Sequence, residues 1–339
     1  MSFLVSGVAD RFRIDRSFHV KYAWVICLFL LTSCGAASNV PPAATQQTSN
    51  ENADLEKVLW DVNQQWLCSG PYMKPFKDCV EFRSKYWVDQ FFEVIPSGEL
   101  LNKEEMVATQ TAGIPSNPAA GTGPYPDAFK LRAVYGDFAM ATDHTNFKTA
   151  DKKSGKLAFT SNAKVLRLFV KENGSWRPAA AGLVPIILPV GPVSPSKHST
   201  TSRKSPNEQL EKELAEADRA WMDSSDMNKR VAYIGKLFTD QWFEILGWDP
   251  TRDTSKAMVL EVLPKLAATA KPGEGVVQDQ FQLQAVFGDV ALASDRRTRT
   301  WTDEKGHLVK TPHRSLLVFV KQNGEWKSAG ASLTPILTP

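Results

Sequence analysis

The sequence predicts an α+β protein made of two similar domains, in which helices come first and long antiparallel strands come last. Its 339 residues, 42% of them hydrophobic, suffice for two packed cores. Long phrases occur twice along the chain at a nearly constant offset. In each copy, apolar residues follow helical spacing early and strand-like alternation late. This order of elements is typical of α+β domains.

The repeated phrases indicate an internal duplication. "DQFFEVI" begins at Asp89 and "DQWFEIL" at Asp240, an offset of 151 residues, while "VKENGSW" at Val170 and "VKQNGEW" at Val320 lie 150 apart. The phrases of the first helices lie 155 apart. Offsets this steady indicate two copies of one domain with small loop insertions. The largest shift falls where the first copy carries two cysteines.

Composition sets the boundaries of the two copies. We place the first domain at 52–187 and the second at 207–339. The intervening segment, 188–206, is rich in proline, serine and lysine, which is typical of an extended linker.

Each domain is predicted to begin with an amphipathic helix. Residues 52–67 and 207–222 carry apolar side chains at helical spacing, and each stripe ends in a tryptophan, Trp66 or Trp221. A short second helical segment then leads into "YWVDQFFEVI" and "LFTDQWFEIL", whose ends look extended.

A third helix is predicted from its cap signals. Asn102 precedes Glu105 by three residues, which is the spacing of a capping box. In the second copy, "TSKAMVLEVLPKL" offers Thr254 or Ser255 as the N-cap.

The late strands are predicted to form hairpins. Gly-Asp and Asn-Gly pairs tolerate the positive φ that tight turns require. The pairs are Gly136-Asp137, Gly288-Asp289, Asn173-Gly174 and Asn323-Gly324. One curved, mainly antiparallel sheet folded over the N-terminal helices gives each domain the shape of a cone with a mouth.

The N-terminus reads as an export signal. Basic residues precede the short apolar run "YAWVICLFLL", which is too short for a permanent membrane span. "LTSC", ending at Cys34, resembles the lipobox of bacterial lipoproteins, which implies a signal peptide at 1–33 and an acylated Cys34 that tethers the chain to the lipid bilayer. Ordinary cleavage and an uncleaved anchor are the alternatives. Residues 34–51 are small and polar, and we expect a flexible tether there.

Location and charge follow from this signal. Gly35 stands where an aspartate would retain such a lipoprotein in the inner membrane, so we expect the outer membrane, facing the periplasm, if the cell has two membranes. Removal of the signal takes away four basic and two acidic side chains and lowers the formal net charge from +3 to +1. A nearly neutral chain argues against nucleic acid as a partner.

Cys68 and Cys79 are the cysteines left for the folded part. They bracket a loop that contains glycine and proline, and outside the cytoplasm such a pair predicts a disulfide. Two free thiols are the alternative, and the spacing expected of a zinc or redox site is missing.

At this level the sequence resembles the SnoaL-like group of the nuclear transport factor 2-like (NTF2-like), or cystatin-like, fold. The resemblance is carried by "KLFTDQWFEIL", the "VFGDVALAS" hairpin and "RSLLVFVKQNGEWKSAGASLTPI", and by their counterparts in the first copy. It implies two cones in tandem. Because members of this fold often form homodimers, it also implies an internal pseudo-dimer with the domains sheet to sheet. Members include isomerases, cyclases, dehydratases and non-enzymatic binding modules, so the fold does not select an activity.

Asp143 and Asp295 are the candidate catalytic residues. Enzymes of this fold generally place a carboxylate in an apolar cavity, and these two aspartates are duplicated on the strand phase that also carries small alanines. That phase either leaves room for a ligand or faces solvent or an interface. In the second copy, Arg297 and His313 could converge on Asp295.

Other chemistry finds little support in the sequence. His307 and His313 flank "LVKTP" without the spacing of a metal site, and we expect solvated strand ends there. Neither a nucleophile elbow nor a phosphate loop is present, and no cofactor or metal is predicted. Trp66 and Trp221 are candidate pocket markers, although an aromatic stripe at helical spacing is more often core packing.

Two function classes remain. The first is a tethered lipoprotein whose cups bind a small apolar ligand or a protein without chemistry. The second is an isomerase, lyase or cyclase that acts on a small apolar substrate in one cone. A dry pocket that holds a carboxylate would favour the enzyme.

Overall fold

The computed structural model describes residues 44–112, 123–150, 157–187, 204–223, 227–247, 250, 253–303 and 305–336. The predicted signal peptide, Cys34 and most of the tether and linker lie outside these residues. The chain divides into two units, 1–49 and 50–339, and the second contains both predicted domains. In the part of the chain that is described, no helix is long and apolar enough to cross a bilayer.

The first domain contributes ten of the described elements and the second contributes nine, and the helices and strands follow the same order in both. The first half of the described chain contains α2 (Ala44–Leu67), the 3-10 helix η1 (Gly70–Tyr72), α3 (Phe76–Tyr86), β1 (Phe92–Val94), β2 (Leu100–Asn102), α4 (Lys103–Ala112), β3 (Gly123–Tyr135), β4 (Phe138–Ala150), β5 (Leu157–Glu172) and β6 (Ser175–Ile187). The second half contains α5 (Glu208–Asp223), α6 (Met227–Leu237), β7 (Phe238–Ile245), β8 (Asp253–Ser255), α7 (Lys256–Thr269), β9 (Gly275–Phe287), β10 (Val290–Thr302), β11 (Leu308–Gln322) and β12 (Glu325–Pro335).

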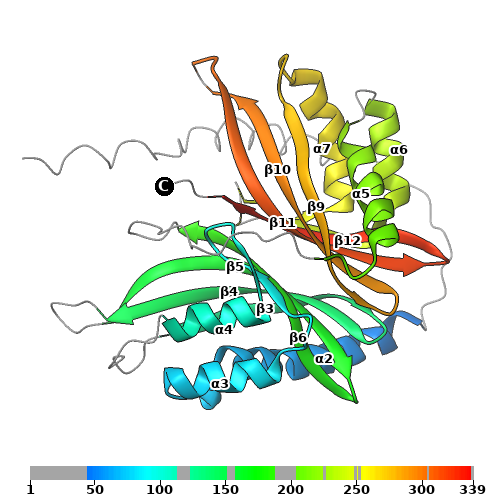
Figure 1. Cartoon of the computed structure of the whole chain (residues 1–339). Coiled ribbons are helices and arrows are strands. Elements are labelled where there is room, and N and C mark those ends of the chain that lie inside the picture. Colours follow the sequence, from blue (N-terminus) through cyan, green and yellow to red (C-terminus); the bar gives the residue numbers. More distant parts are fainter. Residues whose placement is uncertain are drawn as a thin grey trace, which may run out of the picture. The chain divides into compact units, whose positions relative to one another are not determined.

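The two sheets have the same topology. Their strand orders are β2-β1-β6-β5-β4-β3 and β8-β7-β12-β11-β10-β9. The pairs β1–β6 and β7–β12 are parallel, and the other pairs are antiparallel. In Figure 1, α2, α3 and α4 lie on one side of the first sheet, and α5, α6 and α7 lie on one side of the second. The predicted α+β class, with two mainly antiparallel sheets and N-terminal helices, is confirmed.

Local signals act as the sequence predicted. Asn102 Oδ1 accepts a hydrogen bond from Glu105 N, and Glu105 Oε2 accepts one from Asn102 N, both at 2.8 Å, which completes the capping box of α4. Ser255, one of the two predicted caps of α7, accepts from Met258 N at 3.3 Å. At the turn between β5 and β6, Asn173 has a φ of 51°. The start of α2 differs, because it begins at Ala44 and so extends into the segment expected to be a tether. A polar helix leaves no apolar stripe for sequence reasoning to detect.

The two faces of each sheet are both buried. In the second sheet, Ala293 and Leu317 pack against Leu214 of α5 in a core of their own. Alternate residues on the same strands, such as Leu292 and Leu316, belong instead to a core that also contains first-half residues. One face of each sheet therefore packs against the helices of its own domain, and the opposite face packs against the other domain.

Equivalent positions of the two sheets meet each other. Gly182 and Ser332 are 150 residues apart and equivalent, and a Cβ on Gly182 would lie 2.0 Å from Ser332 Oγ. Thr334 Oγ1 donates to the carbonyl oxygen of Leu183 at 2.8 Å. A position that faces its own equivalent lies on a two-fold axis, as in an isologous dimer. These contacts agree with the predicted sheet-to-sheet pair.

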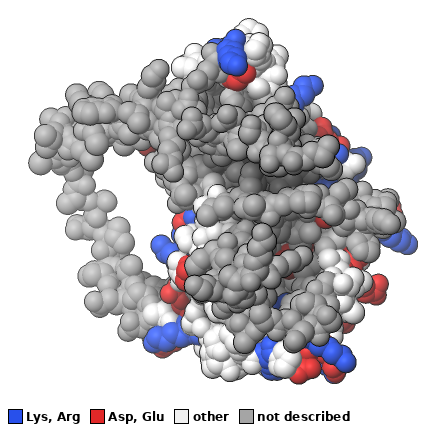
Figure 2. All heavy atoms as spheres, turned by 90° about the vertical axis from the view of Figure 1, so that its left-hand side faces the viewer, with Lys and Arg blue, Asp and Glu red and all other residues white. Residues whose placement is uncertain are grey.

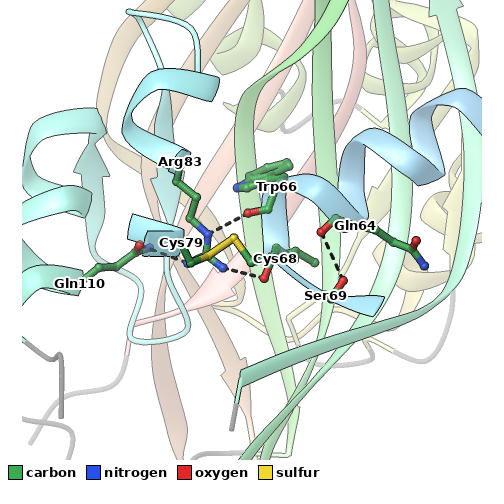
Figure 3. Close-up of a disulfide and its surroundings, with 8 residues drawn as sticks. Gln64, Trp66, Cys68, Ser69, Cys79, Arg83 and Gln110 are labelled. Atoms are coloured by element: carbon green, nitrogen blue, oxygen red, sulfur yellow. Dashed lines mark hydrogen bonds between the residues drawn. A yellow bond between two sulfur atoms is a disulfide. The ribbon is translucent and has the colours of Figure 1, made fainter. Parts of the chain in front are cut away.

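The predicted disulfide joins Cys68 to Cys79 and ties the end of α2 to α3 (Figure 3). Beside it, the buried Arg83 donates to the carbonyl oxygens of Trp66 at 2.8 Å and Leu67 at 2.9 Å. The last carbonyl groups of a helix lack partners within it, so the disulfide and Arg83 together fix the C-terminal end of α2. Trp66, on that last turn, is thereby held in place.

Candidate functional site

Asp143 on β4 lies at the centre of a buried polar cluster inside the first cone. Its side chain accepts hydrogen bonds from Asn63 Nδ2 on α2, Arg167 Nε on β5 and Thr145 Oγ1, each at 2.8 Å. Arg167 Nη2 also donates to Thr145 at 3.0 Å. All four residues are at most 2% exposed. The cluster is therefore closed to water, and the Asp143 charge is neutralised by Arg167.

Asp295 on β10 holds the equivalent place in the second cone. Arg297 Nε donates to Asp295 at 2.5 Å, and Arg297 Nη2 donates to Asp218 on α5 at 2.9 Å. Gln278 Nε2 donates to Asp218 at 2.7 Å. Two of the three residues suggested by the sequence to converge, Asp295 and Arg297, are thus in direct contact. Their partner Asp218 was missed because it lies on the helix, 77 residues before Asp295 in the chain.

The cation comes from a different strand in each cone. Arg297 aligns with Thr145, whereas the position equivalent to Arg167 is Leu317. In the first sheet Thr145 faces Ala163 of β5, and Arg167 on β5 faces Ala141 of β4. Both positions belong to the inner face on adjacent strands, so either can reach the same aspartate. The duplication has kept the buried ion pair while moving the arginine.

Glu93 on β1 and Glu244 on β7 are equivalent residues that the sequence reasoning missed. Each is less than a tenth exposed. Burial raises the pKa of each to about 7, although Arg167 and Arg83 lower that of Glu93 and Arg297 lowers that of Glu244. Among the described residues, nothing makes a hydrogen bond or ion pair with either carboxyl group. A signal was present, since "DQFFEVI" and "DQWFEIL" repeat an acid inside an apolar run.

Charge is shared unevenly in the second cluster. Burial raises the pKa of Asp218 to about 6, against the attraction of Arg297. Burial alone would lower the pKa of Arg297, but Asp218, Asp295 and Glu244 together raise it above its usual value. Three acids surround one arginine, so the second cone favours a bound proton at neutral pH more than the first.

His313 on β11 lies directly opposite Arg297 in the strand register. It is 2% exposed, its Nδ1 lies 3.0 Å from the carbonyl oxygen of Thr311, and burial lowers its pKa to about 4. The expectation of a solvated strand end is therefore wrong for His313, because its strand is covered on both faces. His307 is exposed, with Nδ1 3.3 Å from Asp303, as expected.

The two candidate pocket tryptophans differ in their surroundings. Trp66 is 2% exposed, packs edge-on against Phe169 and has the Arg167 guanidinium 4.5 Å from its ring centre. Trp221 is half-buried, lies 5.7 Å from the Arg297 guanidinium and donates its Nε1 to Asp218 at 3.2 Å. Each tryptophan thus forms one wall of the polar cluster in its own cone and stabilises the arginine by a cation–π contact.

The outer surface of the described chain offers a different kind of site. A hollow on the first domain is lined by Ser84, Asp89, Lys103, Glu104, Val107 and Ala108, between α3 and α4 and outside the cone. On the face shown in Figure 2, the described acidic and basic side chains are interspersed. No cluster of three or more potential metal ligands occurs within the described ranges.

The comparisons with known proteins concern the fold. No protein-family model matches the chain. No curated protein matches it. Among solved structures, an NTF2-like protein with a cystatin-like fold from Novosphingobium aromaticivorans is 15% identical, covers 44% of this chain and 92% of its own, and has a TM-score of 0.32.

Two further solved structures are of the same kind. An NTF2-like superfamily protein from Salmonella enterica is 16% identical and covers 38% of this chain and 93% of its own, with a TM-score of 0.32. The association domain of C. elegans CaMKII is 14% identical, and its match covers 40% of this chain and 97% of the association domain, with a TM-score of 0.31. Each of these matches spans 38 to 44% of this chain's length.

Proposed function

We propose that the protein is an exported lipoprotein, anchored through Cys34, whose paired cone-shaped domains bind a small apolar ligand or a protein partner without catalysing a reaction. One observation carries the non-catalytic part. Each candidate catalytic aspartate, Asp143 or Asp295, is fully buried and neutralised by an arginine, Arg167 or Arg297. A carboxylate held in this way is a poor base, because protonating Asp143 would leave Arg167 buried without an ion-pair partner, and protonating Asp295 would break its pair with Arg297.

The different strand position of the arginine in the two cones also supports a non-catalytic role for the buried aspartates. A catalytic group requires one geometry with respect to its substrate, whereas a structural ion pair requires only charge and hydrogen bonds to be satisfied. Arg167 and Arg297 approach their aspartates from different strands. The constraint common to both cones is therefore the stability of the interior.

Membrane anchoring rests on the sequence around Cys34. Metabolic labelling with an alkyne-bearing palmitate should label the wild-type chain and not the Cys34→Ala variant, and only the wild type should sediment with membranes. A Cys34→Ala chain that still sediments with membranes and resists carbonate extraction would contradict the acyl anchor.

A second candidate function, proton transfer in an isomerase, lyase or cyclase, is favoured by Glu93 and Glu244. Both are buried, neither is engaged by a described donor, and burial raises the pKa of each to about 7, the range that suits a general acid or base. The two functions therefore make opposite predictions about proton exchange: only the enzyme would accelerate it in an enolisable ketone.

One experiment separates them. The full-length protein, purified in detergent, is incubated in D₂O with cyclohexanone and 2-cyclohexenone, and deuterium incorporation is followed by mass spectrometry. The binding module predicts incorporation at the rate of buffer alone. Incorporation that is faster with the wild type and lost in Glu93→Gln or Glu244→Gln would overturn the non-catalytic proposal. Native mass spectrometry of the same preparation should detect a co-purified ligand, and a bare chain in every preparation would count against small-ligand binding.

A further inference from the structure

A buried ion cluster joins the two halves of the chain at one end of their contact. Asp253 on β8 pairs with Lys164 on β5 at 2.5 Å and with Arg132 on β3. The side chains of Lys164 and Arg132 are only 6% and 16% exposed. Two cations from the first half thus share one carboxylate from the second half.

The internal duplication identifies the residues equivalent to the cations. Lys164 faces His144 in the strand register, and Arg314 on β11 faces Arg296 in the same way, so Arg314 is equivalent to Lys164. Arg132 donates to Thr142 at 2.8 Å, and Gln284 donates to the equivalent Ser294 at 3.1 Å. The second half therefore keeps one of the two cations, as Arg314.

The equivalent of the carboxylate follows from the helix that comes after it. Lys103 and Lys256 begin α4 and α7, and each donates to a carbonyl oxygen at the start of the preceding strand region, of Trp87 or Phe238. Three residues before Lys256 lies Asp253, and three residues before Lys103 lies Leu100. At the equivalent position, the first half therefore supplies a leucine in place of a carboxylate.

Arg314 is consequently a buried cation for which the described residues supply no ion pair. It is 9% exposed, its Nε is buried and makes no hydrogen bond, and no described residue forms an ion pair with it. Its neighbour across the strands, Arg296, adds positive charge, and the Arg296 Nε lies 3.9 Å from Asp279. Burying an unpaired charge is costly, so this arrangement favours an anion that the described residues do not supply.

The contact between the halves is symmetric enough for this comparison. Gly182 and its equivalent Ser332 face each other. Tyr135 contacts Thr239 at 3.1 Å, and their equivalents Phe287 and Val88 belong to one hydrophobic core. The two-fold relation that brings Asp253 to Lys164 therefore brings Leu100 toward Arg314.

We propose that Arg314 binds the carboxylate of a small organic acid at the contact between the two halves, in the place that Asp253 fills at the equivalent corner. A guanidinium presents paired donors that match a carboxylate, and Leu100 offers apolar surface to a short hydrocarbon tail. The inference is independent of the proposed function, because the site lies on the outer faces of the sheets and outside both cones.

Isothermal titration calorimetry of the full-length protein in detergent tests the site, with sodium propionate as the probe and chloride held at constant ionic strength. We expect saturable binding, and we expect Arg314→Gln to weaken it at least about tenfold, as the loss of a charge-assisted pair requires. The matched control is Lys164→Gln, which alters the equivalent cation and should leave propionate binding unchanged. Sodium sulfate in a second arm distinguishes a carboxylate site from a general oxyanion site.

A second variant makes the test independent of ligand affinity. In Leu100→Asp the chain itself supplies the missing carboxylate, so propionate binding should disappear, and adding Arg314→Gln should destabilise the folded protein more in the Leu100→Asp background than in the wild type. The proposal is overturned if the wild type does not bind propionate, if Arg314→Gln binds as the wild type does, if sulfate binds more tightly than propionate, or if the two substitutions are additive.

Discussion

Arg167 on β5 and Arg297 on β10 donate Nε to equivalent aspartates, at 2.8 Å and 2.5 Å, although they occupy non-equivalent positions in the duplicated sheet. Each cone therefore provides its buried aspartate with an arginine, but the arginine comes from a different strand position in each cone. A buried acid that lost its cation would destabilise the fold strongly, so the arginine can change strand only if the pair survives the change.

The first cone should remain folded when its arginine is moved by mutation to the strand position that the second cone uses. We expect Arg167→Leu to lower the free energy of unfolding by about 3–5 kcal/mol, because it leaves Asp143 buried without a cation. Adding Thr145→Arg to that variant reproduces the arrangement of the second cone and should recover at least half of the loss. Urea denaturation measures both steps. A double variant no more stable than Arg167→Leu would show that the strand position of the cation matters.

Gly182 should be required for the close approach of the two sheets. A Cβ there would lie 2.0 Å from Ser332 Oγ and 3.3 Å from Leu316 Cβ. We expect Gly182→Ala to cost about 1–3 kcal/mol of stability through overpacking, and Ser332→Gly to restore part of it in the double variant. The control is Gly235→Ala, since a Cβ at Gly235 meets no atom within 4 Å. Equal effects of the two alanine substitutions would contradict the close contact.

Glu93 and Glu244 should make the protein less stable as the pH rises. The usual pKa of a glutamate is 4.5, and burial raises it to about 7 for both. Between these values the folded state keeps a proton that the unfolded state has released, so the contribution is complete below pH 4.5 and is lost as the pH rises through 7. Each group contributes roughly 3 kcal/mol at most.

Neutral amides at these positions test that dependence. Glu93→Gln and Glu244→Gln should each flatten the decline in unfolding free energy measured by urea denaturation between pH 4.5 and 8. Asp218 and His313 lie in the second domain, so the difference between the wild-type and Glu93→Gln curves isolates Glu93. Glu244→Gln also changes the titration of Asp218, whose charge raises the pKa of Glu244, and its curve reports on both groups. Glu213→Gln, which alters an exposed glutamate, is the control. A Glu93→Gln curve parallel to the wild type would refute the raised pKa.

The disulfide between Cys68 and Cys79 should stabilise the first domain. It closes a loop with a sequence separation of 11, for which the chain-entropy estimate is about 2–3 kcal/mol. We expect Cys79→Ser to lower the stability by that amount. Under denaturing conditions without reductant, iodoacetamide should leave both cysteines unmodified, and reduction should expose two more alkylation sites. Modification without reductant would mean that the thiols are free.

The sequence alone determined the architecture of each domain. The capping box at Asn102, the turn at Asn173 and the steady offset between copies are local or repeated signals, each of which acts through residues close together in the chain. The predicted pairing of Cys68 with Cys79 is likewise confirmed, because the short loop between them leaves few alternatives. Such signals need no knowledge of which strand lies beside which.

The interior chemistry was decided only by the tertiary structure. Alternation marked Asp143 and Asp295 as lying on one face of a strand, but it could not say which face was the interior, because both faces of each sheet are buried. Arg297 and Thr145 lie two residues from their aspartates, but Asn63 lies 80 residues before Asp143. Arg167 follows Asp143 by 24 residues on the next strand. The same limit concealed Glu93, which is buried on β1 between strands β2 and β6, and β6 lies far away in the chain. An ion pair across strands depends on register and curvature, and neither is encoded locally.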